Sequence, residues 1–438
     1  MPGRNDAIMI YRAALEAVQP SILLPQYIQL NNDELIIDKK HIPLNKEQHI
    51  YIIGAGKASA AMAQATEKIL GHRINGGIIV TKYDHALPLQ IIECVEASHP
   101  VPDENSLLAV EKTKQILQTA KEGDIIICLL SGGASSLWAD VPESVSLKDQ
   151  QQLFQLLLNC GATIEEMNTI RKHLSSVKGG QLLRYAPMAT WFSFIISDVP
   201  GNLLETIASG PTVADPSTFK EAMQIINKYQ LQLKLPVSVL NHLEKGKLGL
   251  IPETVKADDA VLKNVHTMVI GNNTLALQAA QQKATELGYH TMIHNADMVG
   301  EAGEVARDFI KVCKKYKDTT PACLLMGGET TVTVTGQGKG GRNQHMALCA
   351  LREMMERHND EPNAVIFLSA GSDGTDGPTD AAGAIADIET VSMALQKKLM
   401  PQQYIDNNDA YHFFQHAGGL LKTGPTQTNV MDVVVALI

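Results

Sequence analysis

A lysine follows a glycine turn at the end of the first clearly apolar segment of the sequence. Residues 50–53 are apolar, Gly54 and Gly56 flank an alanine, and Lys57 precedes an alanine- and methionine-rich stretch at 58–70. A strand, a tight turn and a helix in this order leave backbone N–H groups and the positive end of the helix dipole facing an anion. The spacing departs from both the Walker A loop and the dinucleotide fingerprint, each of which requires a further glycine. We interpret the turn as an anion site, with a plain glycine turn and a solvated lysine as the alternative.

A second turn of small residues follows the apolar residues 125–130. It contains, in order, Ser131, Gly132, Gly133 and Ser135. Small side chains let backbone N–H groups approach an oxyanion or a phosphate closely, and the hydroxyls add neutral donors. The pattern lacks the G-x-S-x-G spacing of a serine hydrolase. The alternative to a phosphate site is a tight turn in which a serine caps a helix.

Residues 168–180 form a basic stretch in an otherwise acidic chain. They contain Arg171, Lys172, His173 and Lys178, which together could clamp a phosphate or a carboxylate. Arg171, His173 and Lys178 cannot all share one helical face, so we expect about two of these side chains to reach a ligand and the others to be surface charges. Arg171 and Lys178 are the candidates.

Two aspartates follow apolar runs, where an α/β enzyme places a metal ligand or a base. They are Asp198 and Asp373. The residues around Asp373 are spaced like the front of a calcium loop, but the glutamate that closes an EF-hand is absent. Mg²⁺ bridging phosphate oxygens needs only one or two carboxylates, which this loop can supply. A series of Asx turns is the alternative.

The segment richest in glycine lies in the second half of the chain. Gly336, Gly338 and Gly341 match G-x-G-x-x-G, with Lys339 and Arg342 beside them. A dinucleotide site would require a buried apolar strand before the loop and an acidic residue at a strand end roughly 20 residues further on, and the sequence offers neither. Lys339 and Arg342 beside backbone amides favour a triphosphate over NAD. Arg342 could stabilise charge on a phosphoryl group in transfer.

The elements that must position these residues alternate between short β-branched runs and longer helical segments. This pattern predicts an α/β fold in which parallel strands are joined by crossover helices. The expected strands of a doubly wound, Rossmann-like parallel sheet are 50–53, 76–80, 91–95, 125–130 and 191–196. A second series includes 267–270, 291–294, 322–326, 330–335 and 430–437.

The second series predicts a smaller C-terminal α/β domain. Threonine and valine alternate over residues 331–335, which predicts a strand with one wet face and hence a mixed sheet. Between residues 218 and 263 the pattern turns helical and lysine-rich. We therefore expect an N-terminal domain over 1–245 and a C-terminal domain over 246–438.

Composition narrows the class of protein. A chain of 438 residues with 45% hydrophobic and 19% charged residues fits a globular enzyme of two or three domains and excludes disorder. With 37 Lys+Arg against 47 Asp+Glu the net charge is −10, which argues against nucleic-acid and membrane-surface partners. The six cysteines form no C-x-x-C pair, and we see no signal peptide or membrane span. We expect a cytoplasmic protein.

Taken together, these motifs resemble the glycerate 2-kinases of the MOFRL type, also called class II glycerate kinases. The similarity spans nearly the whole chain, and it depends on the order and number of short strings that are each weak alone. Those strings are residues 54–58, 98–103, 131–135, 178–180, 197–201, 208–212, 327–331, 340–344 and 371–377.

The resemblance implies an ATP-dependent kinase that phosphorylates glycerate at its 2-hydroxyl to give 2-phosphoglycerate and ADP. It also implies Mg²⁺ or another divalent cation, and a cleft between a Rossmann-like domain and a smaller C-terminal domain. Lys57 and Arg342 match the family's catalytic pair. Glycerate and ATP would be the partners, and a homodimer stays open.

The mechanism expected from this resemblance compensates negative charge on the phosphoryl group. Lys57 and Arg342 would approach the γ-phosphate, and one or more of Asp198, Glu329 and Asp373 would carry Mg²⁺ or orient the glycerate hydroxyl. The candidate substrate- and phosphate-binding residues are Gly54, Gly56, Ser131, Gly132, Gly133, Ser135, Arg171, Lys178, Gly340 and Gly341.

Two alternatives stay open. Relatives of this family often carry the name hydroxypyruvate reductase, so an NAD(P)H-dependent reductase could use Gly336, Gly338 and Gly341 for the pyrophosphate. A non-catalytic protein whose two lobes close on a small acid is the other. The number of cationic and acidic groups at strand ends argues against passive capture.

Overall fold

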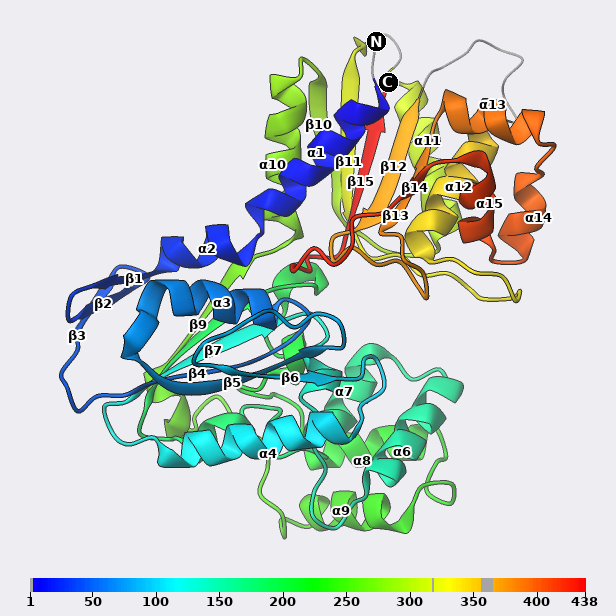
Figure 1. Cartoon of the computed structure of the whole chain (residues 1–438). Helices are drawn as coiled ribbons and strands as arrows, with labels where there is room; N and C mark the ends of the chain where they lie inside the picture. The colour runs from blue at the N-terminus through cyan, green and yellow to red at the C-terminus, as the bar shows by residue number, and fades with distance from the viewer. Residues whose placement is uncertain (1–2, 317–318, 356–364) are drawn as a thin grey trace. The chain divides into compact units, whose positions relative to one another are not determined.

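The computed structural model describes residues 3–316, 319–355 and 365–438. It divides into two compact units (Figure 1). One is continuous and covers Leu24–Ile270, and the other combines Met1–Leu23 with Gly271–Ile438. The continuous unit is called the first unit below and the other the second unit.

The first unit is built on a six-stranded sheet with the strand order β6-β5-β4-β7-β8-β9. Numbered along this sheet, the order is 3-2-1-4-5-6, that of a Rossmann-like doubly wound fold. The pairs β6–β5, β5–β4, β4–β7 and β7–β8 are all parallel. The bounds are β4 (Ile50–Ala55), β5 (Ile74–Lys82), β6 (Glu93–Ala97), β7 (Ile125–Ser131), β8 (Thr190–Ile196) and β9 (Val265–Gly271). The strand order reverses between β4 and β7, which is where such folds bind ligands.

Helices cover both faces of this sheet. α3 (Ser59–Leu70) lies above it and α4 (Glu104–Thr119) below it in the view of Figure 1. Every residue of β7 is buried, as expected for a strand that is covered on both faces. Asp103 caps α4, because its side chain accepts a hydrogen bond from the Ser106 amide.

The remainder of the first unit is a group of helices and a small antiparallel sheet. The helices are α5 (Ala134–Leu137), α6 (Leu147–Asn159), α7 (Ile164–Lys172), α8 (Phe219–Lys228) and α9 (Val237–Lys247). A separate core, which includes Leu153, Ile170, Phe219 and Leu243, joins the last four of these helices, whereas α5 belongs to the core beside the parallel sheet. The sheet is β1 (Ile28–Asn31), β2 (Glu34–Ile37) and β3 (Lys40–Pro43), and the 3₁₀ turns are η1 (Gly71–Arg73), η2 (Gln181–Tyr185), η3 (Pro200–Asn202), η4 (Ile207–Ser209) and η5 (Ala260–Asn264).

The second unit contains a mixed sheet with the order β10-β11-β15-β12-β13-β14. β10 and β11 are parallel, whereas β15 is antiparallel to both of its neighbours, β11 and β12. The bounds are β10 (His290–Met298), β11 (Ala322–Gly328), β12 (Ile366–Gly371), β13 (Gly383–Ala386), β14 (Leu420–Leu421) and β15 (Asp432–Leu437).

Alternate residues of β15 face opposite layers of helices. Val434 and Ala436 belong to the core that contains residues of α11 and α12, so Val433 and Val435 face the other layer. On that other side, α1 packs against α10, β12 and β15. The helices are α1 (Arg4–Ala17), α10 (Asn273–Glu286), α11 (Ala302–Lys314), α12 (Arg342–Met355), α13 (Ile388–Gln396), α14 (Pro401–Asp406) and α15 (Ala410–Ala417), and α2 (Pro20–Tyr27) crosses from one unit into the other.

Within the described ranges, the segment Arg4–Tyr27 is long and apolar enough to cross a membrane by length and composition. Core helices pass the same test. Half of the most apolar window is buried, and Tyr11 of α1 donates a hydrogen bond from its hydroxyl to the carbonyl oxygen of Gly371 at 2.7 Å. The apolar face of α1 is therefore buried within the fold.

The predicted fold class is confirmed: a Rossmann-like parallel sheet and a smaller α/β part with a mixed sheet. The predicted strand over 330–335 is wrong. Thr331 forms an isolated bridge with Glu301, and residues 332–335 leave the sheet as irregular chain. The mixed character arises from β15, which lies antiparallel between β11 and β12.

The division into units falls after Ile270 and places Met1–Leu23 with the C-terminal segment. The sequence led us to expect a domain boundary between residues 245 and 246. Two physical features account for the difference. β9 adds a last strand to the first sheet, and α1 packs against α10, both across long stretches of sequence.

Candidate active site

The loops after β4 and β7 meet at the point where the strand order of the first sheet reverses. The Lys57 amide donates to the Gly132 carbonyl oxygen at 2.9 Å, and the Ala58 amide donates to Ser131 Oγ at 2.9 Å. The Gly56 amide donates to the Val80 carbonyl oxygen at 3.1 Å. We expected these amides to face an anion, but those of Lys57 and Ala58 join the two loops, and that of Gly56 bonds to β5. These backbone amides are therefore used within the fold.

Two glycines allow this close approach. Gly56 has φ +133°, and a Cβ there would lie 2.2 Å from Ser131 Oγ. Gly133 has φ +85°, and a Cβ there would lie 3.1 Å from the His99 ring and 3.5 Å from Lys57 Cγ. Glycine is the residue that fits such positions. The structure therefore brings the Lys57 side chain and His99 to the same turn.

Gly54, in contrast, lies inside β4 and serves packing. A Cβ at this residue would lie 2.4 Å from the Leu129 carbonyl oxygen of the neighbouring strand.

His99 was not among the predicted site residues. Its position in the sequence could have identified it, because it lies two residues after Ala97, the last residue of β6.

A chain of polar contacts links the loop after β7 to the basic stretch. Ser135 Oγ lies 3.0 Å from Ser209 Oγ, which donates to Asn168 Oδ1 at 3.3 Å. Arg171 Nη1 donates to the same Asn168 oxygen at 2.7 Å. Burial lowers the pKa of Arg171 to about 10, so its guanidinium stays charged near neutral pH. Ser135 and Arg171, both predicted, thus belong to one cluster.

The turn that supplies Ser209 is conformationally strained. Ala208 and Ser209 have φ values of 55° and 59°, in the left-handed region that residues other than glycine rarely adopt. Such residues cost on the order of 1–3 kcal/mol each and persist where the surroundings hold them. The Ser209 hydroxyl contacts to Ser135 and Asn168 are part of that support.

Lys178 is a buried cation held by a carbonyl group. Its Nζ donates to the Trp138 carbonyl oxygen. Burial, opposed by the charge of Asp140 and aided by that of Arg171, lowers the pKa of Lys178 to about 8. Asp140 in turn accepts hydrogen bonds from the Ser176 amide and hydroxyl at 2.6 and 2.7 Å. Arg171 and Lys178 are therefore electrostatically coupled in one cluster.

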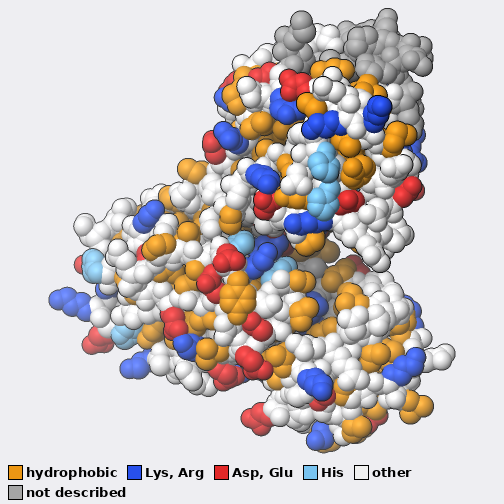
Figure 2. All heavy atoms as spheres, turned by 45° about the vertical axis from the view of Figure 1, so that its right-hand side comes forward, with side chains coloured by type: hydrophobic (Ala, Val, Ile, Leu, Met, Phe, Trp, Pro, Cys, Tyr) orange, Lys and Arg blue, Asp and Glu red, His pale blue; other side chains and the backbone are white. Residues whose placement is uncertain are grey.

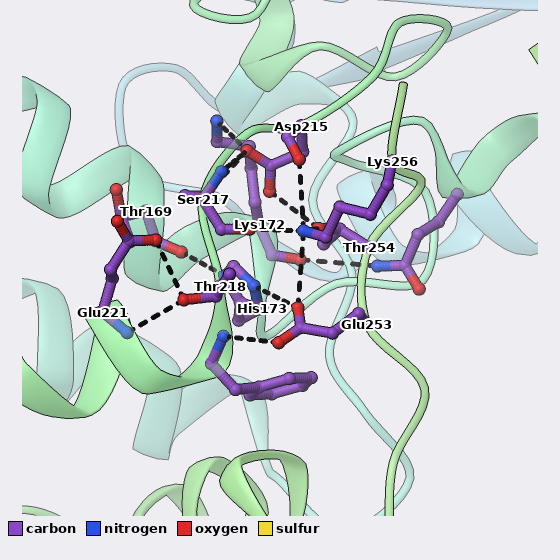
Figure 3. A network of polar contacts seen from close by, with 12 residues as sticks. Thr169, Lys172, His173, Asp215, Ser217, Thr218, Glu221, Glu253, Thr254 and Lys256 are labelled. Carbon is purple, nitrogen blue, oxygen red and sulfur yellow. Dashed lines mark hydrogen bonds and ion pairs between the residues drawn. The ribbon is translucent and has the colours of Figure 1, made fainter. Parts of the chain in front are cut away.

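The end of α7, which carries the basic stretch, is fixed by a network of ion pairs (Figure 3). Lys172 Nζ lies 2.8 Å from Asp215 Oδ1, and Thr254 Oγ1 donates to Asp215 Oδ2 at 2.9 Å. His173 Nε2 lies 3.1 Å from Glu253 Oε2. Lys172 and His173 thus hold segments of the chain together. Both are buried, whereas the sequence predicted that the side chains of the basic stretch that do not reach a ligand would be surface charges.

A cavity of about 150 Å³ lies beside this network. Its lining includes His173, Ser176, Phe219, His242 and Thr254. None of the predicted site residues lines it.

In the second unit, Arg342 is the first residue of α12 and pairs with two carboxylates. Its Nε donates to Asp432 Oδ2 at 2.6 Å and its Nη2 to Asp432 Oδ1 at 3.0 Å, a bidentate pair. Its Nη1 donates to Glu329. Burial alone would lower the pKa of Arg342, but Asp432 and Glu329 hold it above its usual value. The guanidinium is therefore permanently charged and oriented.

The G-x-G-x-x-G segment is engaged by the turn between α14 and α15. The Gly336 amide donates to Asn408 Oδ1 and the Lys339 amide to Asp409 Oδ1, both at 2.8 Å. The Gly338 amide donates to the Asn407 carbonyl oxygen at 2.8 Å. These amides are used within the fold, so the loop does not present them to a pyrophosphate.

The N-terminus of α12 is also occupied. Asp376 accepts hydrogen bonds from the Asn343 amide at 3.0 Å and the Gln344 amide at 2.8 Å. Burial raises the pKa of Asp376 to about 6, although these amides lower it. A Cβ at Gly341 would lie 2.3 Å from Asp376, so Gly341 makes room for this cap. Gly340 lies in ordinary contact distance of α15.

The predicted metal ligands do not form a preassembled cage. Asp198 follows β8 in the first unit, whereas Glu329 and Asp373 belong to the second. Asp373 Oδ1 accepts hydrogen bonds from the Thr375 amide at 2.9 Å and hydroxyl at 3.0 Å. Over residues 3–316, 319–355 and 365–438, no group of three or more His, Cys, Asp or Glu side chains could hold a metal ion.

Charges on the surface are mixed in sign. On the face shown in Figure 2, lysine and arginine side chains are scattered among acidic and uncharged ones, with no broad basic patch. This agrees with the net charge of −10.

Two family models match the chain. The first, described as a domain of unknown function (DUF4147), matches residues 6–244. The second, the MOFRL family, matches residues 322–432. The second match thus includes Arg342 and ends at Asp432, its buried partner.

The chain is similar over its full length to curated proteins. It is 38% identical to a glycerate 2-kinase of Pyrococcus horikoshii, covering 100% of this chain and 98% of that protein. It is 39% identical to a D-glycerate 2-kinase of Thermotoga maritima, covering 99% and 97%. The chain belongs to the glycerate 2-kinase family of the MOFRL type.

Solved structures agree with this family. The crystal structure of a Thermotoga maritima glycerate kinase matches with a TM-score of 0.84 at 37% identity, over 99% of both chains. A relative from Agrobacterium vitis, 36% identical over 98% of this chain and 93% of its own length, bears the name putative hydroxypyruvate reductase. The resemblance stated from the motifs is confirmed.

Proposed function

We propose that this protein is a glycerate kinase that transfers the γ-phosphoryl group of ATP to the 2-hydroxyl of glycerate. The observation that carries the proposal is the full-length similarity to proteins named glycerate 2-kinase and D-glycerate 2-kinase, at 38% and 39% identity. Phosphoryl transfer needs positioning and charge compensation more than covalent chemistry. A cation in the loop after β4, Lys57, and one at the start of α12, Arg342, suit that need.

Lys57 and Arg342 are the groups we propose to act on the phosphoryl group. Lys57 extends from the loop at the switch point of the first sheet, beside Gly133. Arg342 is held charged by two carboxylates. Replacing such an arginine typically lowers turnover by about 10³- to 10⁵-fold.

The cluster that contains Ser135, Arg171 and Lys178 supports anion binding. We propose that these side chains bind the carboxylate of glycerate or a phosphate group. The other candidate binding residues at this edge of the sheet are Gly54, Gly56, Ser131, Gly132 and Gly133, of which Gly54 and Gly56 act by packing. Gly340 and Gly341 would act in the same indirect way, by shaping the start of α12.

A divalent cation is expected to enter with ATP. Mg²⁺ is commonly held by one or two carboxylates together with phosphate oxygens and waters, so a preassembled protein cage is not required. Asp373 and Asp198 fit that demand as single carboxylates after strands. When bound, the cation would neutralise charge on the phosphates.

The reductase alternative has little support. Its name occurs on a relative 36% identical to this chain, while the amides that would hold a pyrophosphate are bonded to Asn408 and Asp409. A cytoplasmic location and a homodimer remain predictions. Size-exclusion chromatography with light scattering tests the latter.

The proposal is tested by the release of ADP. We expect ADP formation that depends on both glycerate and Mg²⁺, and no loss of NADH absorbance with hydroxypyruvate. ADP release that is independent of glycerate would refute the proposal. Ligand binding without any turnover would instead support the non-catalytic alternative.

A further inference from the structure

The two carboxylates that contact Arg342 lie in different environments. Asp432 is fully buried, whereas the Glu329 side chain is 44% exposed. The Arg342 side chain is 33% exposed. One partner is thus part of the core, and the other lies at the surface.

Asp432 is the first residue of the central strand β15, and its neighbours in register are both glycines. It pairs with Gly328 of β11 and Gly371 of β12. A Cβ at Gly371 would lie 3.5 Å from Asp432 Oδ1. The absence of side chains beside Asp432 leaves room for its carboxylate to lie over the sheet and receive the guanidinium of Arg342.

The backbone at Asp432 is also fixed by a buried amide. Asn273 Nδ2 donates to the carbonyl oxygens of Val430 and Asp432 at 2.8 and 2.9 Å. A Cβ at Gly327 would lie 1.7 Å from Asn273 Oδ1, so Gly327 makes the space that Asn273 occupies. A continuous set of contacts therefore runs from α10 through Asn273 and Asp432 to Arg342.

The donors of the Arg342 guanidinium go to two partners, the buried Asp432 and the exposed Glu329. Asp432 takes the Nε donor and one Nη2 donor in a fork geometry. Arginine has five donors, so the Nη1 edge and the second Nη2 donor remain for other anions. Glu329 occupies part of that edge. A phosphoryl group with a greater negative charge would compete for the same donors.

We propose that Asp432 is a positioning residue that fixes Arg342, and that Glu329 is a stand-in anion that the phosphoryl group of the nucleotide displaces. This inference rests on the proposed function of Arg342. It assigns Glu329 the role of competitor for the guanidinium, in place of the metal ligand that the sequence suggested.

The test is a double-mutant cycle on kcat with Arg342→Ala and Asp432→Asn. In the wild-type background, Asp432→Asn should lower kcat by about 10- to 100-fold, the cost of misplacing a catalytic group. KM for ATP should change much less. In the Arg342→Ala background, Asp432→Asn should have no further effect on kcat, because the group that Asp432 positions is gone. An independent, multiplicative loss in that background would refute the positioning role.

A matched control is available in the same unit. Asp387 forms a bidentate pair with Arg4, with Nε–Oδ2 and Nη2–Oδ1 distances of 2.7 and 2.8 Å. Asp387→Asn should lower thermal stability and leave kcat within about twofold. If Asp387→Asn lowers kcat as much as Asp432→Asn does, the effect of Asp432 is a general loss of stability and the proposal fails.

The exposed partner gives a test that does not depend on the folding of a core variant. Glu329→Gln should lower KM for ATP by about two- to fivefold, because an exposed carboxylate no longer competes for Arg342. Its kcat and its dependence on Mg²⁺ concentration should stay as in the wild type. A fall in kcat together with a higher Mg²⁺ requirement would show a metal ligand and overturn the stand-in role.

Arg342→Ala distinguishes a failure of the proposed function from a failure of the further inference. If Arg342→Ala retains full kcat, the proposed role of Arg342 is wrong. If Arg342→Ala is inactive but Asp432→Asn and Glu329→Gln both behave as the wild type, the further inference alone is wrong.

Discussion

Arg342 and Lys178 show how burial has opposite consequences for two cations. Arg342 has two carboxylate partners, so its pKa is raised and its charge is permanent. Lys178 has a carbonyl partner, and burial lowers its pKa to about 8. Arg342 is therefore suited to stabilising the charge of a phosphoryl group during its transfer, at any working pH. Lys178 is charged only below about pH 8.

Substrate binding should therefore weaken in mild alkali. If Lys178 binds an anionic group as proposed, kcat/KM should fall as pH rises through about 8, because the lysine loses its proton there. In Lys178→Arg the side chain keeps its charge, so this fall should shift to higher pH. The measurement is kcat/KM for glycerate from pH 6.5 to 9.5. Identical profiles for the two proteins would remove Lys178 from anion binding.

The ion pair between Lys172 and Asp215 should matter for stability. Burial alone would raise the pKa of Asp215, but the hydrogen bond from Lys172 and its charge hold it below the usual value. This carboxylate therefore adds stability above its unfolded-state pKa, and that contribution is lost as pH falls through the folded-state value. Asp215→Asn should lower the free energy of unfolding by about 3–5 kcal/mol at neutral pH, because it leaves a buried charge unpaired.

The control for this pair is an exposed one. Lys228 pairs with Glu166 and its side chain is 59% exposed, so Lys228→Gln should lower the free energy of unfolding much less than Asp215→Asn does. Urea unfolding of the three proteins provides the comparison. Equal costs for the two variants would contradict the structural role given to the buried pair.

At the scale of elements, α12 depends on a carboxylate that lies outside the helix. Asp376 accepts the amides of Asn343 and Gln344, and its pKa is raised to about 6. A raised pKa in a carboxyl group means that the folded state binds the proton more tightly than the unfolded state. This group's contribution to stability is therefore greatest in mild acid and falls as pH rises from about 4 through about 6.

Asp376→Asn should test this cap. The amide side chain offers one acceptor oxygen for two backbone donors, so the variant should lose about 1–3 kcal/mol. Its cost relative to the wild type should be larger at pH 4.5 than at pH 7.5, because the wild type loses this group's contribution over that range. Thermal unfolding at both pH values measures it. A cost that is greater at pH 7.5 would contradict the raised pKa.

Patterns of spacing predicted the elements better than they predicted what the loops do. The alternating runs identified the parallel sheet, since strands covered on both faces are apolar throughout. The threonine alternation over 331–335 was misleading, because Glu301 pairs with Thr331 alone. The glycines at 336–341 predicted a loop with free amides, but Asn408 and Asp409, some 70 residues away, bind those amides. Local sequence cannot show such a partner.

At the scale of the whole molecule, local sequence also fails to show contacts made by residues from the two ends of the chain. Lys57 and Arg342 could be chosen from their motifs. Asp432 could not, because it is an aspartate in an apolar strand and only the register of β15 places it beside Arg342. Likewise, the packing of α1 on β15 and α10 has no counterpart in the local pattern.

The N-terminal helix should therefore stabilise the second unit. The Tyr11 hydroxyl donates to the Gly371 carbonyl oxygen at 2.7 Å, and both groups are buried. Tyr11→Phe should cost about 1–3 kcal/mol, because the carbonyl group loses its partner. Tyr316→Phe is the control, since that hydroxyl bonds to the weak acceptor Met292 Sδ at 3.3 Å. Equal melting temperatures for Tyr11→Phe and the wild type would contradict this role of α1.

Phosphorus NMR of the reaction product shows whether the protein phosphorylates glycerate at the 2-hydroxyl. Purified protein would be incubated with glycerate, ATP and Mg²⁺, and the phosphorus signal correlated with the glycerate protons. We expect a phosphomonoester coupled to the single proton on carbon 2, together with ADP. A phosphoester coupled to the two protons on carbon 3, or no phosphoester at all, would contradict phosphorylation at the 2-hydroxyl.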